Sequence, residues 1–304
     1  MTTMPGVAGE RRWLLAAAGL GALGGFCLAR ATGPRRSLSV EGEKEPKDRS
    51  DPKMKGKRKG RREIICEDAL KWIDEMQSFP FGAMVFTSLP DMSEVVEFLG
   101  PRFEDWEQFF MKAVRQILAA LPLNGVAVFY QTDVRLAEKG QVSKAFLVLK
   151  AAQEVPQVRL KWHKIVHFGT IDQPTWNAVQ FTHLLCFAKG PPEVARVGCQ
   201  GPDDEVVDLG STIPDVLERG PKPSLRKGAC CMGLNATMAV LKWATRRLPG
   251  LHTVIDPFCG AGTVLAVANE FGLDAIGVDI SPKRIKQAQR LNAKDLRPKA
   301  PVER

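Results

Sequence analysis

A glycine-rich turn near the end of the chain carries the strongest chemical signal in the sequence. An apolar run stops at Asp256, glycines follow at positions 260 and 262, and residues 263–271 have the pattern of a helix. Such a turn lets the backbone approach a ligand closely, and the helix that follows presents free N–H groups to it. A second predicted strand, 274–279, ends in an acid at the spacing where a carboxylate meets ribose hydroxyls. The pattern therefore predicts a nucleotide-binding βαβ unit.

The ligand of this unit need not be a dinucleotide. The turn Gly260-Ala261-Gly262-Thr263 lacks the third glycine of the dinucleotide fingerprint. Asp256 also places a negative charge where a pyrophosphate would sit. A carboxylate in that position favours a cationic ligand.

The string Val254–Leu265, VIDPFCGAGTVL, resembles motif I of the S-adenosylmethionine (SAM)-dependent methyltransferases. It is most similar to the DPFxGxGT form of the amino-methyltransferases that act on DNA and RNA bases. The resemblance implies SAM as the cofactor. It also implies an α/β, Rossmann-like class I methyltransferase fold with a mostly parallel, doubly wound sheet of seven strands.

Elements that can position this turn alternate along residues 63–296. Continuous apolar runs such as 83–87 and 125–131 are typical of parallel strands that are covered on both faces. Helical spacing of apolar residues predicts a long helix over 103–121. The remaining predicted elements are strands at 63–68, 158–166 and 182–189 and helices at 69–76, 144–154 and 235–248. Residues 190–228 are rich in proline, glycine and acids and are predicted to form a loop.

The order of the motifs is unusual for this resemblance. A predicted strand runs directly into Ser88-Leu89-Pro90-Asp91, and this segment precedes the glycine turn in the chain. Only one strand–helix unit follows the turn. The layout resembles the circularly permuted, beta-class amino-methyltransferases, in which the catalytic motif is N-terminal to the cofactor motif. The resemblance covers about residues 63–296.

The resemblance implies a set of cofactor contacts. Asp256, Gly260 and Gly262 would line the methionine side of SAM, and Asp279 would bind the ribose hydroxyls. Asp68 and its neighbour Ala69 would meet the adenine, although Asp68 is also placed to cap the helix that follows it. The full predicted cofactor set is Asp68, Asn235, Asp256, Phe258, Gly260, Gly262, Thr263 and Asp279.

The catalytic motif of the family reads Asn/Asp/Ser-Pro-Pro-aromatic, and this chain has Ser88, Pro90 and Asp91 in its place. The motif holds an exocyclic NH2 so that its lone pair points at the SAM methyl, and positioning supplies most of the rate. The departure is Asp91, because the family places there a ring that stacks on a flipped base. A carboxylate can instead accept hydrogen bonds from an amino or imino group, which suggests recognition of a guanine-like N–H donor edge or a substrate other than a flipped adenine or cytosine. Aromatics that can replace the ring are Trp106, Tyr130, Trp162 and Trp176.

The predicted activity is methyl transfer from SAM to a nitrogen of a nucleic-acid base. RNA is favoured over DNA, because no large domain for duplex sequence recognition is present and the catalytic motif is altered. Two alternatives stay open: a SAM-binding scaffold without activity, and a methyltransferase of a small-molecule or protein amine. No metal site is expected, because the seven cysteines show no CxxC pair or zinc-ligand spacing and resemble reduced intracellular thiols.

The N-terminal 62 residues differ from the rest of the chain. They hold fifteen Lys+Arg and six Asp+Glu, whereas the remainder holds 28 of each, so the net charge of +9 belongs to this extension. Residues 13–29 form an apolar run that predicts a membrane anchor or an organelle presequence, with a secretory signal as a weaker alternative. Residues 37–62 are expected to be a disordered basic linker, a localisation signal or a nucleic-acid-gathering tail, and 297–304 a C-terminal tail. An organellar or membrane-anchored location is thus expected, with nucleus or cytoplasm as alternatives, and the sequence leaves the oligomeric state open.

Overall fold

A computed structural model describes residues 60–168, 179–190, 213–220 and 232–292. These residues all belong to one compact unit, Met54–Arg304. The predicted apolar segment at 13–29, most of the basic linker and the C-terminal tail lie outside the described residues. Within the described part of the chain, no helix has the length and apolar character that crossing a membrane requires.

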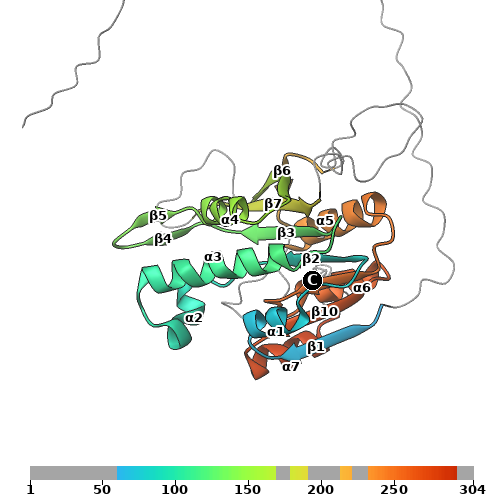
Figure 1. Ribbon diagram of the computed structural model, residues 1–304, viewed down its shortest axis with the longest axis horizontal. Helices are drawn as coiled ribbons and strands as arrows, with labels where there is room; N and C mark the ends of the chain where they lie inside the picture. Colours follow the sequence, from blue (N-terminus) through green and yellow to red (C-terminus); the bar gives the residue numbers. More distant parts are fainter. Residues whose placement is uncertain (1–59, 169–178, 191–212, 221–231, 293–304) are drawn as a thin grey trace, which may run out of the picture. The chain divides into compact units, whose positions relative to one another are not determined.

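The described residues contain one sheet of eight strands and a separate two-stranded hairpin (Figure 1). Five adjacent strands of the large sheet, in the order β1-β10-β9-β2-β3, are parallel, and β7 and β6 follow in antiparallel pairing. The strands are β1 (Arg62–Cys66), β2 (Ala83–Thr87), β3 (Val126–Gln131), β6 (Val158–His167), β7 (Phe181–Lys189), β8 (Val216–Glu218), β9 (Thr253–Asp256) and β10 (Asp274–Asp279). The predicted mostly parallel α/β fold is confirmed.

Among the described residues the large sheet has eight strands, whereas the resemblance implies seven. The additional strand is β8, which pairs in parallel with β6 at the edge of the sheet. It lies in the segment 190–228, which was predicted to be a loop throughout. Three residues with one partner strand give little alternation in the sequence, which explains why the pattern did not reveal it.

Helices cover both faces of the sheet and create two cores (Figure 1). On one face pack α5 (Leu234–Arg247), α6 (Thr263–Glu270) and α7 (Pro282–Arg290). On the other pack α1 (Ala69–Met76), α3 (Phe103–Ala119) and α4 (Lys144–Gln153). Alternate residues of the central strands supply the two cores, because successive side chains of a strand point to opposite faces. This doubly covered sheet is why the predicted strands are continuously apolar.

Two further elements were absent from the sequence-based prediction. No element was predicted for the segment after the catalytic motif, but it forms helix α2 (Met92–Leu99) with Asp91 as its N-cap residue. Strands β4 (Val134–Leu136) and β5 (Gly140–Val142) form a hairpin beyond β3. Both elements border the site described below.

The strand order fixes where a ligand can bind. From β2 the chain continues to β3 on one side, and from β9 it continues to β10 on the other side. Neighbouring strands whose connections leave in opposite directions open a crevice beyond their carboxyl ends, and open α/β sheets bind ligands there. Asp256 ends β9 and Ser88 follows β2, so the two predicted motifs meet at this crevice.

Candidate active site

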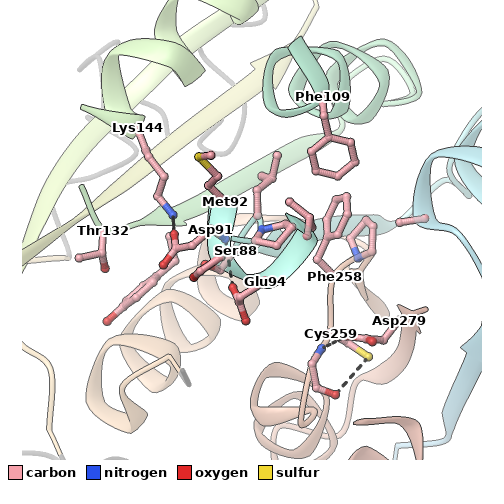
Figure 2. A pocket seen from close by; sticks show the side chains of 18 of the residues that line it. Ser88, Asp91, Met92, Glu94, Phe109, Thr132, Lys144, Phe258, Cys259 and Asp279 are labelled. Atoms are coloured by element: carbon pink, nitrogen blue, oxygen red, sulfur yellow. Dashed lines mark hydrogen bonds and ion pairs between the residues drawn. The ribbon is translucent and has the colours of Figure 1, made fainter. Parts of the chain in front are cut away.

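A cavity of about 1120 Å³ lies beyond the carboxyl ends of the parallel strands. It is lined by both predicted motifs, which lie on neighbouring strands (Figure 2). Of the predicted site residues, those that line it are Asp68, Ser88, Pro90, Asp91, Asp256, Phe258, Gly260, Thr263 and Asp279. The fold therefore places the cofactor turn and the catalytic motif around one space.

Asp256 lies at the bottom of the cavity and is 1% exposed. Its Oδ1 accepts hydrogen bonds from Thr87 Oγ1 at 2.6 Å and from the backbone N–H of Phe258 at 3.2 Å. Burial raises the pKa of this carboxyl to about 7, and these two hydrogen bonds only partly offset the effect, to which the charge of Asp279 adds. A cation bound beside Asp256 would favour its ionised form.

Asp279, at the end of β10, fixes the glycine turn. Its Oδ2 accepts a hydrogen bond from the N–H of Gly260 at 3.1 Å, and its Oδ1 accepts one from the N–H of Ser281 at 2.8 Å. Arg284 on α7 approaches the same carboxylate at 3.7 Å and contacts Glu94 on α2 at 2.8 Å. The acid predicted to meet ribose thus also connects the turn to two helices.

The two glycines of the turn have different structural roles. Gly260 has a φ of +50°, and a Cβ built on it would meet nothing within 4 Å, so its backbone faces open space. Gly262 has a φ of +83°, and a Cβ there would lie 2.8 Å from the Cβ of Ala288 on α7. Gly260 therefore leaves room for a ligand, whereas Gly262 allows close helix packing. The structure does not place Gly262 in the cavity wall, although it was predicted as a cofactor residue.

This difference gives a paired prediction. Gly262→Ala is expected to destabilise the fold by about 2–4 kcal/mol, since it combines a left-handed φ with a clash against α7. Gly260→Ala is expected to cost only about 1 kcal/mol of stability and to act mainly on ligand binding. Urea unfolding of both variants checks this. Equal destabilisation by the two substitutions would contradict the assignment.

Two further predicted cofactor residues, Asp68 and Asn235, differ in position. Asp68 caps α1, because its Oδ1 accepts hydrogen bonds from the N–H groups of Leu70 at 2.7 Å and Lys71 at 3.3 Å. It also lines the cavity, so both interpretations of Asp68 are compatible with the structure. Asn235 is exposed at the start of α5 and does not line the cavity. Its backbone N–H instead donates to the carbonyl of Arg219 at 3.1 Å.

The catalytic segment is held by groups on three helices. The carbonyl of Pro90 accepts a hydrogen bond from Trp106 Nε1 at 3.2 Å, and the N–H of Asp91 donates to Glu94 Oε2 at 3.0 Å. The carboxylate of Asp91 pairs with Lys144 Nζ at 2.5 Å. The half-buried Ser88 lines the cavity beside them (Figure 2). Asp91 is thus a cavity residue with a cationic partner that the sequence pattern did not reveal.

The aromatic residues proposed to replace the missing ring are mostly in the core. Trp106 is fully buried, and Trp162 packs against Trp243 with ring centroids 5.1 Å apart. Tyr130 does line the cavity, whereas Trp176 lies outside the described residues. Sequence reasoning passed over Phe109 on α3, which lines the cavity and packs edge-to-face on Phe258 with ring centroids 6.3 Å apart (Figure 2).

Several charged residues of the cavity were also not predicted. Besides Lys144, Glu94 and Arg284, they include Arg219, whose guanidinium lies 4.3 Å from the Phe168 ring centroid. A signal existed for Glu94, because an acid three residues after Asp91 is typical of a helix N-terminus. The other three are brought in from distant segments and leave no local pattern.

Neither a metal ion nor a thiolate is suggested by the described side chains. Among the described residues no three His, Cys, Asp or Glu side chains are grouped so that they could hold a metal ion. Burial raises the pKa of the Cys259 thiol, and the charges of Asp256 and Asp279 add to this effect. The thiol therefore stays protonated near neutral pH and is a poor nucleophile.

Comparisons with known proteins agree with this geometry. A family model described as DNA methylase matches residues 250–290, the segment that contains β9, α6, β10 and α7. The comparison with curated proteins gave no significant match.

Solved structures share the fold at low sequence identity. TTHA0409 of Thermus thermophilus, described as a candidate DNA modification methylase, is 18% identical with a TM-score of 0.55, covering 78% of this chain and 96% of that one. Its complex with S-adenosyl-L-methionine gives 19% identity and a TM-score of 0.54, with the same coverage of both chains. The PvuII cytosine-N4-specific DNA methyltransferase is 14% identical with a TM-score of 0.57, covering 78% and 88%.

These matches support two expectations from the sequence: the fold, and the resemblance of the cofactor motif. The structural neighbours share the class I methyltransferase fold, and the family model matches the very segment that carries the glycine turn. The chain therefore has the fold of the class I methyltransferases and, through its cofactor-motif segment, resembles the SAM-dependent amino-methyltransferases.

Proposed function

We propose that the protein is a SAM-dependent methyltransferase that transfers a methyl group to an amino nitrogen of a nucleic-acid base. The observation that carries this proposal is the single cavity in which Asp256 and Asp279 of the cofactor turn face Ser88, Pro90 and Asp91. A cofactor site alone would fit many class I enzymes. Its junction with the altered catalytic motif supports transfer to an amine.

The residues present fit SAM as the cofactor. Gly260 leaves open space above the turn, and the buried Asp256 favours a cationic ligand. Asp279 would bind the ribose, and Asp68 with Ala69 would border the adenine, as the resemblance implies. When bound there, SAM supplies a methyl group activated by a positively charged sulfur.

The protein's own residues would position the amine and exclude water. Ser88 presents a hydroxyl to the cavity, and the hydrogen bond from Trp106 fixes the carbonyl of Pro90. A direct in-line transfer gains most of its rate from such positioning. Phe109 and Phe258 add apolar surface that keeps the site dry.

The charges of the cavity favour entry of a base rather than of the phosphate backbone. Seven acidic and five basic side chains line the cavity. Two of the basic side chains, Lys144 and Arg284, form ion pairs with acidic side chains. Phosphates are attracted to basic surfaces, so they would stay outside while an uncharged base enters. The basic N-terminal extension can supply phosphate contacts.

The comparisons do not support the expected preference for RNA. The similar proteins are named as DNA methylases, so DNA is the first substrate to test. Transfer from tritiated SAM to single-stranded DNA, duplex DNA and RNA, followed by nucleoside analysis, is expected to give a methylated amino base. SAM binding without transfer to any nucleic acid would contradict the proposal and favour a scaffold or another amine substrate.

A further inference from the structure

Asp91 stands at the motif position where the family that the sequence resembles has an aromatic ring, and in the structure it forms an ion pair with Lys144. Lys144 is the first residue of α4, and its Nζ lies 2.5 Å from Asp91 Oδ1. Both residues line the cavity, and Figure 2 shows the lysine reaching down to the carboxylate. The two residues are far apart in sequence, so the fold brings them together.

A purely structural role does not account for Lys144. Its side chain is only 3% exposed, and burying an ammonium costs free energy unless its donors are satisfied. An ammonium has three donors, yet Asp91 is its one hydrogen-bond acceptor among the residues that the structure describes. The cation also stands at the N-terminus of a helix, where the macrodipole opposes a positive charge. The Phe110 ring centroid lies 5.9 Å from Nζ, and Lys144 lines the cavity. Two donor positions of this buried charge are thus without a hydrogen-bond acceptor among the described residues.

Asp91 offers a matching acceptor. One carboxylate oxygen pairs with Lys144, and the side chain, which also takes part in the capping box of α2, is 32% exposed and lines the cavity. Its backbone is fixed because its N–H donates to Glu94. The pair thus presents a donor and an acceptor side by side, which is complementary to a molecular edge that carries an acceptor beside an N–H donor.

We propose that Asp91 and Lys144 recognise the edge of the target base, in place of stacking on its face. Asp91 accepts a hydrogen bond from the amino group that receives the methyl, and Lys144 donates one to the ring nitrogen beside it. Adenine, with N6 and N1, and cytosine, with N4 and N3, both present this edge. The inference rests on the proposed function and assigns the specificity of its site to this pair.

The test compares bases with and without the ring acceptor. Single-stranded oligonucleotides contain adenine or 1-deazaadenine, and cytosine or 3-deazacytosine, so that the amino group is kept and the ring nitrogen is lost. Wild type is expected to prefer the parent base about 10- to 100-fold in kcat/KM, the loss typical of a hydrogen bond to a charged group. In Lys144→Met, kcat/KM on the parent base is expected to fall by a similar factor. The ratio of kcat/KM between the parent and the deaza base is expected to be less than about threefold.

Lys164 supplies the matched control. It is also buried, 8% exposed, and pairs with a single aspartate, Asp215, at 2.6 Å, but it does not line the cavity. Lys164→Met is expected to keep the discrimination of wild type, whatever its effect on stability. Both variants are expected to bind SAM as wild type does in calorimetry. Full discrimination in Lys144→Met, or equal loss in both variants, would overturn the assignment.

A second variant guards against unfolding of Lys144→Met. Asp91→Asn keeps the shape and one acceptor oxygen but removes the charge, and we expect kcat/KM to fall at least about tenfold with unchanged SAM affinity. Unchanged kcat/KM would overturn the recognition pair. Wild type that methylates the parent and the deaza bases equally well would also overturn the recognition pair, but it would leave the methyltransferase proposal standing. A wild type that binds SAM but methylates neither base overturns this inference, whereas the proposed function is contradicted only if no nucleic acid accepts a methyl group.

Discussion

Replacing Asp279 with alanine is expected to weaken SAM binding by about 100-fold, or about 3 kcal/mol. The carboxylate stands at the end of β10 on the wall of the cavity, where it would accept hydrogen bonds from two ribose hydroxyls. Each hydrogen bond to a charged group contributes about 1.5–3 kcal/mol, and the loss is reduced because water replaces part of it. Calorimetric titration of the full chain with SAM measures the effect.

The control for this prediction lies on the same strand. Asp274 begins β10 at the opposite end and does not line the cavity, so Asp274→Ala is expected to leave SAM affinity unchanged. Asp279 also accepts hydrogen bonds from the N–H groups of Gly260 and Ser281. Asp279→Asn retains one acceptor oxygen for these hydrogen bonds. An affinity loss in Asp279→Ala that Asp274→Ala reproduces would remove the ribose role.

Local patterns were sufficient to predict most of the fold. The helix Ala69–Met76 and the strands Ala83–Thr87 and Asp274–Asp279 have the predicted bounds, because their apolar periodicity and flanking residues are unambiguous. The meeting of Asp256 with the segment at Ser88 followed from the resemblance, and the structure places both on one cavity. These features depend on short stretches of sequence.

Features that depend on distant contacts could not be predicted. Lys144 and Asp91 meet only when the start of α4 is brought to the segment before α2, and no spacing rule connects them. Gly262 was assigned to the ligand because the motif contains it, whereas its close neighbour is Ala288. Helix α2 is a different case, since Asp91 followed by Glu94 carries a recognisable helix-start signal that was not used.

The second large expected effect concerns Asp256 and pH. Burial raises its pKa to about 7 in the folded chain, against an ordinary value of 3.8, so the folded state binds a proton more tightly than the unfolded state between these values. The stability contributed by the protonated carboxyl is complete below pH 4 and is lost as pH rises toward 7. Asp256→Asn keeps the acceptor for Thr87 and cannot ionise. The variant is therefore expected to match wild type near pH 4 and to be more stable by up to about 4 kcal/mol at pH 8.

Urea unfolding of both proteins from pH 4 to pH 8 measures this difference, because the titrations of groups that do not interact with Asp256 cancel. A pH-independent difference would show that the pKa of Asp256 is not raised in the folded state. SAM affinity should depend on pH in the opposite direction to stability, because the cation binds the ionised form of Asp256. A cation stabilises the carboxylate, so affinity is expected to rise with pH up to about 7, by at most about tenfold per pH unit, and then to level off. Asp256→Asn should bind SAM more weakly and without this rise, which would connect the instability of the empty site to its preference for a cationic cofactor.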